Sequence, residues 1–210
     1  MVKIISSTVC LLCLLSVSFI FFVSLSLAET ASQHAQKGLS LTKRGQLDQA
    51  IEEFKKAIAI DRKYANAHYN LGMVYHLKAA QKNNINTREL DTTFPTQTYR
   101  TKWTNVEELN LAINEFKEVL RLQPNAADAH FKLGLLYDNK GDITNAMTEY
   151  REAIRIDPKG PDGLDSRNNI ALILFYVQGK RDEAIKELET VLKINPNHPA
   201  EKNIKKIKGN

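Results

Sequence analysis

Residues 127–137 read Ala-Asp-Ala-His-Phe-Lys-Leu-Gly-Leu-Leu-Tyr, and Ala146, Tyr150 and Pro158 follow them along the chain. The small residues Gly134 and Ala146 allow two antiparallel helices to approach closely, and the large ring of Tyr150 fills the space beside them. Proline cannot continue a helix, so Pro158 stops the second one. The stretch therefore predicts two packed helices joined by a short turn.

The same pattern recurs along the chain at regular spacings. A separation of 34 residues links Gly38 with Gly72, Ala112 with Ala146, Phe116 with Tyr150, and Pro124 with Pro158. A separation of 62, which is 34 plus 28, links Ala50 with Ala112, Phe54 with Phe116, and Gly72 with Gly134. A separation of 38, which is 34 plus 4, links Ala146 with Ala184, Tyr150 with Leu188, and Pro158 with Pro196. This period is that of a helix-turn-helix repeat, so we predict four repeats and two interruptions.

The recurring residues resemble the tetratricopeptide repeat (TPR) over about residues 31–198. The resemblance implies an all-α solenoid with repeats at about 31–64, 65–126, 127–160 and 165–198, which form one domain within 29–210. We expect helix pairs at about 32–44 with 47–60, 65–82 with 105–122, 127–139 with 143–156, and 166–177 with 181–194. The copies depart from the family pattern at Arg62, which replaces a proline, and at Leu172, which replaces a small residue.

The longer interruption lies inside the second repeat, at about 79–106. Its centre is rich in threonine and contains Phe94, Tyr99 and the only tryptophan, Trp103. Long loops within compact domains are usually functional or disordered, and both an ordered lid and a mobile loop remain open here. The shorter interruption, at residues 159–163, contains two glycines and a proline and is expected to be a loop.

The N-terminal segment has the character of an export signal. Residues 1–28 carry one charge, at Lys3, followed by an apolar and serine-rich run. Small residues at Ser26 and Ala28 favour cleavage after Ala28, and the alternative is an uncleaved membrane anchor. Either case places the repeats outside the cytoplasm. Both cysteines lie in this segment, and the chain has no Asn-x-Ser/Thr acceptor, which favours the bacterial periplasm, with or without an inner-membrane anchor.

The formal net charge of +5 is modest, and basic residues alternate with acidic ones along most of the chain. The exception is a lysine-rich tail: Lys202, Lys205, Lys206 and Lys208. Ala200, Ile204 and Ile207 have amphipathic spacing there, which predicts a capping helix at 199–208 over the end of the solenoid. Contact of these lysines with anionic lipid is the alternative. We expect no nucleic-acid partner, because no basic groove interleaved with stacking aromatics is present.

The sequence contains no phosphate-binding glycine loop, no metal-spaced histidine pair and no nucleophile beside a base. Three histidines take the same place in the first helices of three repeats and are expected to pack there: His34, His68 and His130. We expect His76 at the surface, and the acidic pairs at 52–53 and 107–108 on solvated helix turns. We therefore predict a protein that is not an enzyme and that holds no metal or cofactor.

The resemblance to TPR proteins implies a partner-binding groove on the concave surface that the first helices form. Carried over by position, the groove includes Leu39 in the first repeat and Asn66, Tyr69, Asn70, Met73 and His76 in the second. It continues through Phe131, Lys132 and Leu135 in the third repeat and Asn169, Ile173 and Tyr176 in the fourth, and Trp103 is added from the insertion. An apolar centre with a polar rim is typical of protein-binding surfaces. The alternative is that Tyr69, Met73, Phe131 and Leu135 simply pack against neighbouring helices.

Chaperone-adaptor members of the family hold a carboxylate with lysine, asparagine and arginine side chains. The corresponding places here hold Ala35, Leu39, Asn70, Asp128 and Lys132, which argues against such a clamp. We therefore expect a non-catalytic adaptor or scaffold that binds a peptide or a helix of a partner protein. The alternative is a structural module that assembles with copies of itself into a homo-oligomer.

Overall fold

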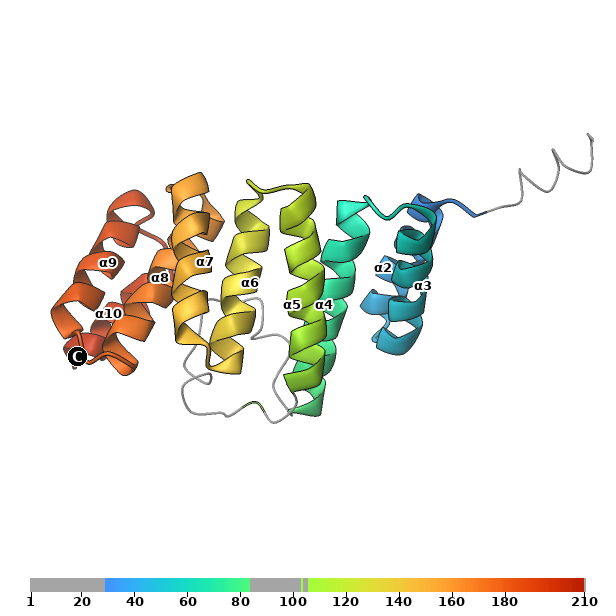
Figure 1. The fold of residues 1–210 in the computed structure, drawn as a ribbon. Coiled ribbons are helices and arrows are strands. Elements are labelled where there is room, and N and C mark those ends of the chain that lie inside the picture. Colours follow the sequence, from blue (N-terminus) through green and yellow to red (C-terminus); the bar gives the residue numbers. More distant parts are fainter. Residues whose placement is uncertain (1–28, 84–102, 104–105, 210) are drawn as a thin grey trace, which may run out of the picture.

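The computed structural model describes residues 29–83, 103 and 106–209. Over these residues every regular element is an α-helix, and the helices run from one end of the stack to the other in chain order (Figure 1). They are α2 (Ala31–Lys43), α3 (Leu47–Ile60), α4 (Ala65–Lys82), α5 (Val106–Leu122), α6 (Ala127–Lys140), α7 (Ile143–Ile156), α8 (Pro161–Tyr176), α9 (Arg181–Ile194) and α10 (Ala200–Lys208). The predicted all-α solenoid is confirmed.

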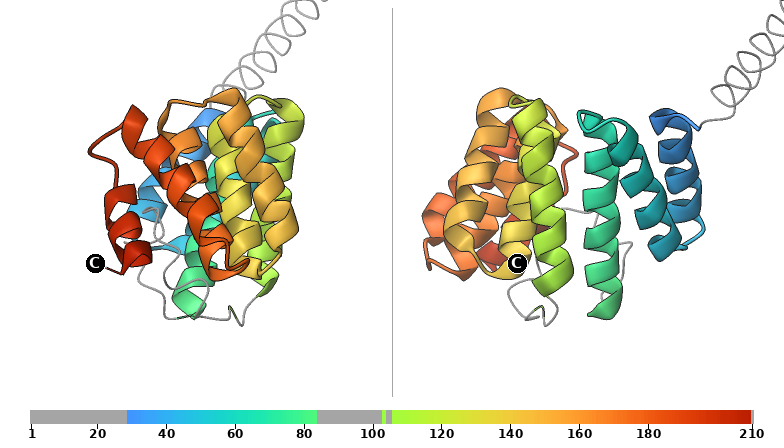
Figure 2. Two further views of the ribbon diagram at one scale, coloured as in Figure 1. Left: turned by 90° about the vertical axis from the view of Figure 1, so that its left-hand side faces the viewer. Right: turned by 45° about the vertical axis from the view of Figure 1, so that its right-hand side comes forward.

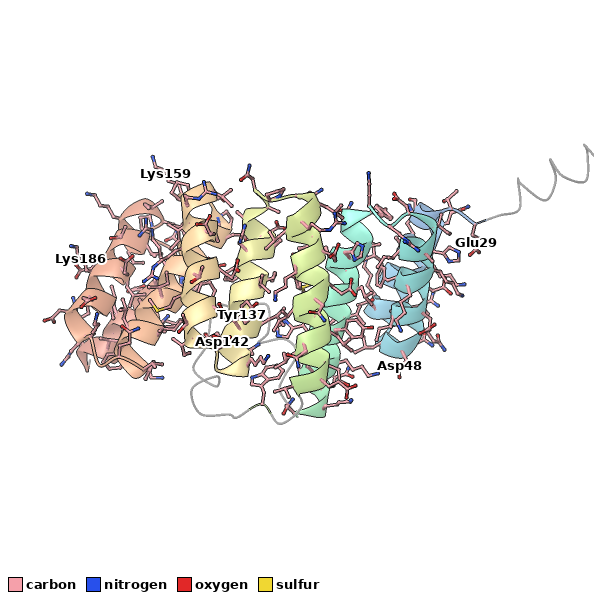
Figure 3. All side chains as sticks on the ribbon, in the orientation of Figure 1. Glu29, Asp48, Tyr137, Asp142, Lys159 and Lys186 are labelled. Atoms are coloured by element: carbon pink, nitrogen blue, oxygen red, sulfur yellow. The ribbon has the colours of Figure 1, made fainter. Side chains whose placement is uncertain are left out.

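Successive helices form antiparallel pairs, α2 with α3 through α8 with α9, and each pair packs on the next (Figure 2). Among the first helices of the pairs, α2 contacts α4 and α6 contacts α8. Figure 3 places Glu29 and Lys186 at opposite ends of this stack. The predicted export segment, residues 1–28, and the centre of the predicted insertion, residues 84–102, lie outside the described residues. None of the described helices combines the length and the apolar character that crossing a bilayer requires.

The first three helix pairs each close on a glycine that touches an aromatic ring of the second helix. A Cβ atom built on the glycine would lie 2.8 Å from Phe54 at Gly38, 2.9 Å from Phe116 at Gly72 and 2.7 Å from Tyr150 at Gly134. These distances are shorter than a carbon contact allows, and the three rings are fully buried. The close helix approach predicted from the glycine spacing is confirmed. The fourth pair has Leu172 and Leu188 at the two equivalent positions, both buried.

A second contact repeats in the same register. His34, His68 and His130 each place Nδ1 2.7 Å from a glutamate Oε2, on Glu53, Glu115 and Glu149 respectively. Each glutamate directly precedes the aromatic residue that packs on the glycine. The histidines were expected only to pack between helices. Each one also forms a polar contact with a glutamate of the second helix, and this contact links the two helices of the repeat.

The expectation of solvated acidic pairs is wrong for Glu53 and Glu108, which are both 6% exposed. Glu53 accepts from His34, Lys37 and Lys56. These partners, His34 first, hold the pKa of Glu53 at about 2 although burial raises it. Glu108 pairs with Lys82 at the far end of α4. Buried carboxylates need such partners, and the partners come from elsewhere in the folded chain.

His68 and His130 have partners on both ring nitrogens. The Nε2 atoms lie 3.3 Å from the carbonyl oxygen of Arg62 and 3.1 Å from that of Pro124, respectively. Carbonyl and carboxylate oxygens both accept, so for His130 only the protonated ring, with two N–H donors, satisfies both contacts. The hydrogen bond to Glu149 accordingly raises the pKa of His130, more than partial burial lowers it.

Helix α8 begins at Pro161 rather than at about residue 166, so the loop predicted for residues 159–163 is wrong from Pro161 onward. Gly160 is the N-cap, and proline is favoured in the first helical position because its missing N–H would have no partner there. The first turn lies against the end of α7, where a Cβ on Gly163 would be 1.8 Å from the Asp157 carbonyl oxygen. Glycine permits this contact.

Helix α10 covers the last repeat, as predicted for a capping helix, and contacts α9 and α8. Its own Ala200 and Ile207 are buried on the side that faces the repeat. Asn203 Nδ2, also on α10, donates to Asn168 Oδ1 of α8 over 2.7 Å. Its lysines lie on the outer side, where Lys206 stands 5.6 Å from the centre of the Tyr176 ring. The cap therefore buries the apolar end of the solenoid and leaves a basic face to solvent.

We expect Gly134→Ala to lower the free energy of unfolding by about 1–3 kcal/mol, because the added methyl group overlaps the Tyr150 ring. In an exposed helix the same change would raise stability by about 1 kcal/mol. Urea unfolding followed by circular dichroism measures the difference. The control adds Gly134→Ala to a Tyr150→Leu background, where the methyl group should cost much less. A Gly134→Ala protein more stable than the wild type would show that the contact is not tight.

The His130–Glu149 pair should stabilise the fold more in mild acid than in base. Because the folded pKa of His130 is raised, its contribution is fully present below the unfolded value of about 6.5 and is lost as the pH rises through the folded value. We expect Glu149→Gln to cost about 0.5–1 kcal/mol more at pH 5.5 than at pH 8.5, measured by urea unfolding. Glu107→Gln on an exposed turn serves as the control, and an equal cost at both pH values for Glu149→Gln would contradict the pairing.

Candidate binding groove

The residues predicted to line the groove divide into an accessible set and a buried set. Eight are exposed or half-buried: Leu39, Asn66, Tyr69, Asn70, Met73, Lys132, Leu135 and Tyr176. Five are buried: His76, Trp103, Phe131, Asn169 and Ile173. Most of the accessible set lies on α2, α4 and α6, and most of the buried set lies from Phe131 onward. The accessible groove is therefore concentrated in the N-terminal half of the stack.

One pocket opens among the accessible residues, between the start of α4, the end of α5 and the start of α6. Its volume is about 320 Å³. It is lined by Ala65, Asn66, Tyr69, Asn70, Val119, Gln123 and Asp128. We call this the amide pocket, because three of its seven lining residues carry side-chain amides. Such groups donate and accept hydrogen bonds at once, and they suit a ligand that offers both.

Two contacts fix the side chains of the amide pocket. The Tyr69 ring meets the buried Phe116 ring edge to face, with centroids 5.2 Å apart, so the tyrosine is braced by the core while half of it stays accessible. Asn70 Nδ2 donates to the Asn66 carbonyl oxygen over 2.7 Å. This bond orients the Asn70 amide along the helix surface. Its side-chain oxygen makes no hydrogen bond within the described residues.

Three predicted groove residues lie in the core, and for Phe131 this agrees with the packing alternative. Phe131 packs on Tyr150 with ring centroids 6.2 Å apart, and Asn169 Nδ2 donates to the Tyr150 hydroxyl over 3.2 Å. Ile173 is fully buried. The physical reason is that α6 and α8 both pack on α7, so Phe131 and Asn169 meet at the buried Tyr150 side chain. Ala35, one of the places compared with the carboxylate clamp, is buried as well.

His76 was expected at the surface, and this is wrong: it is 4% exposed and its ring lies 5.9 Å from that of Trp103. Asn139 Nδ2 donates to His76 Nε2 over 2.9 Å, so Nε2 accepts and the ring is neutral. Burial, with a contribution from the Lys132 charge, lowers the pKa of His76 to about 4. Trp103, itself buried, is thereby packed against the His76 ring on α4, which is in turn hydrogen-bonded to Asn139 of α6.

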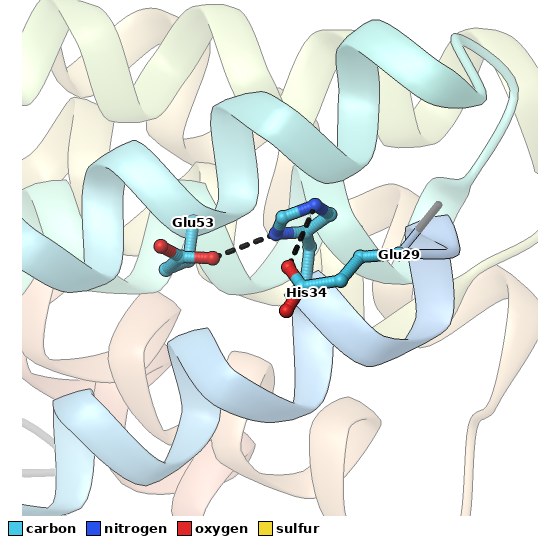
Figure 4. A group of neighbouring side chains, drawn as sticks. All are labelled: Glu29, His34 and Glu53. Carbon is cyan, nitrogen blue, oxygen red and sulfur yellow. Dashed lines mark hydrogen bonds and ion pairs between the residues drawn. The ribbon is translucent and has the colours of Figure 1, made fainter. Parts of the chain in front are cut away.

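A separate cluster, Glu29, His34 and Glu53, has oxygen and nitrogen atoms within 4.8 Å of one another (Figure 4). Its chemistry is that of an ion-pair network. Both ring nitrogens of His34 face carboxylates, at 3.1 Å from Glu29 and 2.7 Å from Glu53. Lys37 and Lys56 also bind Glu53, so its charge is already balanced. A divalent cation would have to displace these cations, which makes the cluster a poor metal site.

Sequence reasoning missed Val119 and Gln123 as pocket residues. Both lie near the end of α5, a second helix of a repeat, whereas the family resemblance points only to first helices. Asp128 stood among the places compared with the carboxylate clamp, and it lies at the pocket rim in the first turn of α6. No spacing signal marks Gln123, because its position follows from how the end of one repeat meets the start of the next.

Comparisons with known proteins give one family. Three family models match the chain: a TPR repeat at residues 38–78, a tetratricopeptide repeat at 106–161 and another at 164–198. Together they cover more than half of the chain. No curated protein matches the sequence.

Several solved structures share the fold. MamA is 24% identical with a TM-score of 0.62, and the match covers 83% of each chain. Pseudomonas aeruginosa pilF is 21% identical with a TM-score of 0.62, over 84% of this chain and 67% of that one. A human IFIT1 dimer with PPP-AAAA is 18% identical with a TM-score of 0.66, over 89% of this chain and 40% of that one. At these identities the likenesses establish the architecture alone.

The buried His76 should make the fold sensitive to acid. Its pKa falls from about 6.5 unfolded to about 4 folded, so between these values the unfolded chain binds a proton that the folded chain does not, and stability is lost as the pH falls. We expect His76→Gln, which keeps an acceptor for Asn139, to remove up to about 3 kcal/mol of the stability difference between pH 7 and pH 4. Urea unfolding monitored by Trp103 fluorescence tests this. An unchanged pH dependence in the variant would contradict it.

Proposed function

Since the chain belongs to the tetratricopeptide repeat family, we propose that it is a non-catalytic scaffold that binds an extended peptide segment of a partner protein. The observation that carries this proposal is the amide pocket. Every residue of an extended peptide presents a backbone donor and a backbone acceptor. The amides of Asn66, Asn70 and Gln123 offer the complementary groups around one accessible cavity.

Tyr69 is the aromatic anchor of the proposed site. Its ring is braced on one side by Phe116, so binding immobilises little additional side-chain freedom. Tyrosine is enriched among the residues that contribute most to binding energy, because it combines a large apolar surface with a polar tip. Leu39 and Met73 lie on the neighbouring accessible surface and supply apolar contact area beside the pocket.

The length of the accessible groove indicates a short binding segment. A pocket of about 320 Å³ has room for a few side chains, at the lower end of the usual range for ligand sites. Phe131, Asn169 and Ile173 are packed in the core, which limits the groove toward the C-terminal end. We place the peptide across α4 and the start of α6.

We also propose that the scaffold acts outside the cytoplasm, in a bacterial periplasm. This rests on residues 1–28, whose single charge and apolar run resemble an export signal. Intact-mass analysis of the protein from its native host tests the proposal: a chain that begins at Glu29 supports export with cleavage, and a membrane-bound chain that retains Lys3 supports an anchor.

The groove proposal predicts that Tyr69→Ala and Asn70→Ala weaken peptide binding while the fold is retained. Peptides selected from a displayed random library should lose about tenfold or more in affinity for Tyr69→Ala, as expected for an aromatic anchor. Fluorescence polarisation measures the affinity, and circular dichroism checks the helix content. Asn70 does not contact the core ring, so Asn70→Ala separates loss of binding from loss of packing.

Leu111→Ala is the matched control, because Leu111 is an exposed apolar residue of α5 that does not line the amide pocket. It should leave peptide affinity unchanged. Selected peptides that bind Tyr69→Ala and Asn70→Ala as tightly as the wild type would falsify the groove proposal. Light scattering without peptide tests the alternative of self-assembly, which gives a mass that rises with protein concentration.

A further inference from the structure

The electrostatic character of the amide pocket opposes that of the whole chain. The chain carries a formal net charge of +5, yet the only charged residue that lines the pocket is Asp128. Its side chain is exposed, and within the described residues it makes no ion pair or hydrogen bond. An unpaired carboxylate at the rim of a cavity attracts cationic groups, and field lines in a concave site strengthen the effect.

More carboxylates continue from the pocket toward α8. Asp162, in the first turn of α8, has a raised pKa, first because of its burial and then because of the nearby charges of Asp128, Asp165 and Asp157. Lys132 is the cation that opposes this effect. The repulsion from Asp128 adds to the negative character beside the pocket, which Asp128 itself lines.

The four carboxylates differ in the hydrogen bonds that they already accept. Asp165 Oδ1 lies 2.9 Å from His198 Nε2, and Asp157 Oδ1 accepts from the Gly160 N–H over 2.9 Å. Asp162, like Asp128, has no ion pair or hydrogen bond within the described part of the chain. The N-terminal ends of α6 and α8 favour an acid in each first turn, but that helix dipole offsets only part of a unit charge. Asp128 and Asp162 are thus the two of these four carboxylates with no hydrogen-bond partner in the described part of the chain.

A second observation on α8 is independent of these charges. Among the residues that the structure describes, Ser166 Oγ and Asn169 Oδ1 are fully buried and have no hydrogen-bond partner. They follow Asp162 at the spacings that place residues on one helix face. Unpaired buried polar atoms are rare, and these two keep an unused capacity for hydrogen bonds below the surface of α8. This capacity and the negative charge lie along the same face of α8.

We propose that the peptide bound by this groove is basic, and that a lysine or arginine side chain of the peptide pairs with Asp128 and extends toward Asp162. The inference rests on the proposed peptide-binding function and adds the chemical class of the partner. The backbone of the segment binds the amides of the pocket, and its charge supplies selectivity, because an acidic segment would meet two carboxylates without compensation. Arginine suits the site best, since its planar fork can bind two acceptors at once.

The test uses protein expressed from the full sequence and a displayed random peptide library. We expect the enriched peptides to contain more lysine and arginine than the starting library. The probe is the most enriched peptide, labelled with fluorescein, together with a counterpart in which its basic residues are replaced by glutamine. Fluorescence polarisation should show weaker binding of the glutamine counterpart, and weaker binding of the basic peptide when the salt concentration rises from 50 to 500 mM, because salt screens the contact.

Protein variants locate the contact. Asp128→Asn should weaken the basic probe about two- to fivefold, the range expected for an accessible ion pair, and leave the glutamine probe unchanged. The double variant Asp128→Asn with Asp162→Asn should weaken the basic probe further. Asp182→Asn is the matched control, because Asp182 is an exposed acid in the first turn of α9, away from the pocket.

The outcomes separate this inference from the function on which it rests. Enrichment of neutral or acidic peptides whose binding still depends on Tyr69 and Asn70 would overturn the basic partner and leave the groove function standing. Equal binding of the basic probe to Asp128→Asn and to the wild type would also overturn it. If no peptide is enriched, both the peptide-binding function and its basic specificity fail.

Discussion

The contact of a glycine with an aromatic ring sets the geometry of the first three repeats. With no Cβ at Gly38, Gly72 or Gly134, the two helices of each pair approach until the ring lies against the backbone. The ring in turn fills the space that the absent side chain leaves, so helix spacing and core packing are decided together. In the fourth repeat the glycine and the aromatic residue are replaced together, by Leu172 and Leu188, and both leucines are buried. The two positions of the contact therefore change as a pair.

The packing of successive helix pairs decides which of the groove positions stay accessible. Where α6 meets α8, the side chains of Phe131 and Ile173 are taken into the core, and the surface is closed. Near the start of α4 the cavity beside Tyr69 stays open and is lined by both apolar and amide side chains. One architecture therefore produces a closed core and an accessible cavity from equivalent positions of different repeats.

The sequence predicted the repeat architecture well, because a fixed period marks each helix pair and because glycine and proline mark many of the helix ends. It placed α8 too late, since two glycines and a proline suggested a loop where Gly160 and Pro161 start a helix. It could not foresee the burial of Glu53, because His34 and the lysines that compensate the charge become neighbours only on folding. Whether a first-helix residue such as Asn169 is open or buried depends on the packing between repeats, which a repeat pattern does not encode.

The His–Glu pairs have a consequence for how such a chain can change in length. In the first three repeats the histidine, the glutamate, the glycine and the aromatic residue all belong to one repeat. Duplication of one of these units by recombination would copy its internal contacts complete, and only the faces between units would need to adapt. The fourth unit differs: Arg167, not a histidine, binds Glu187 there, and Asn168 is committed to the last helix. New units can therefore be gained within the row, while the final one is specialised as its terminus.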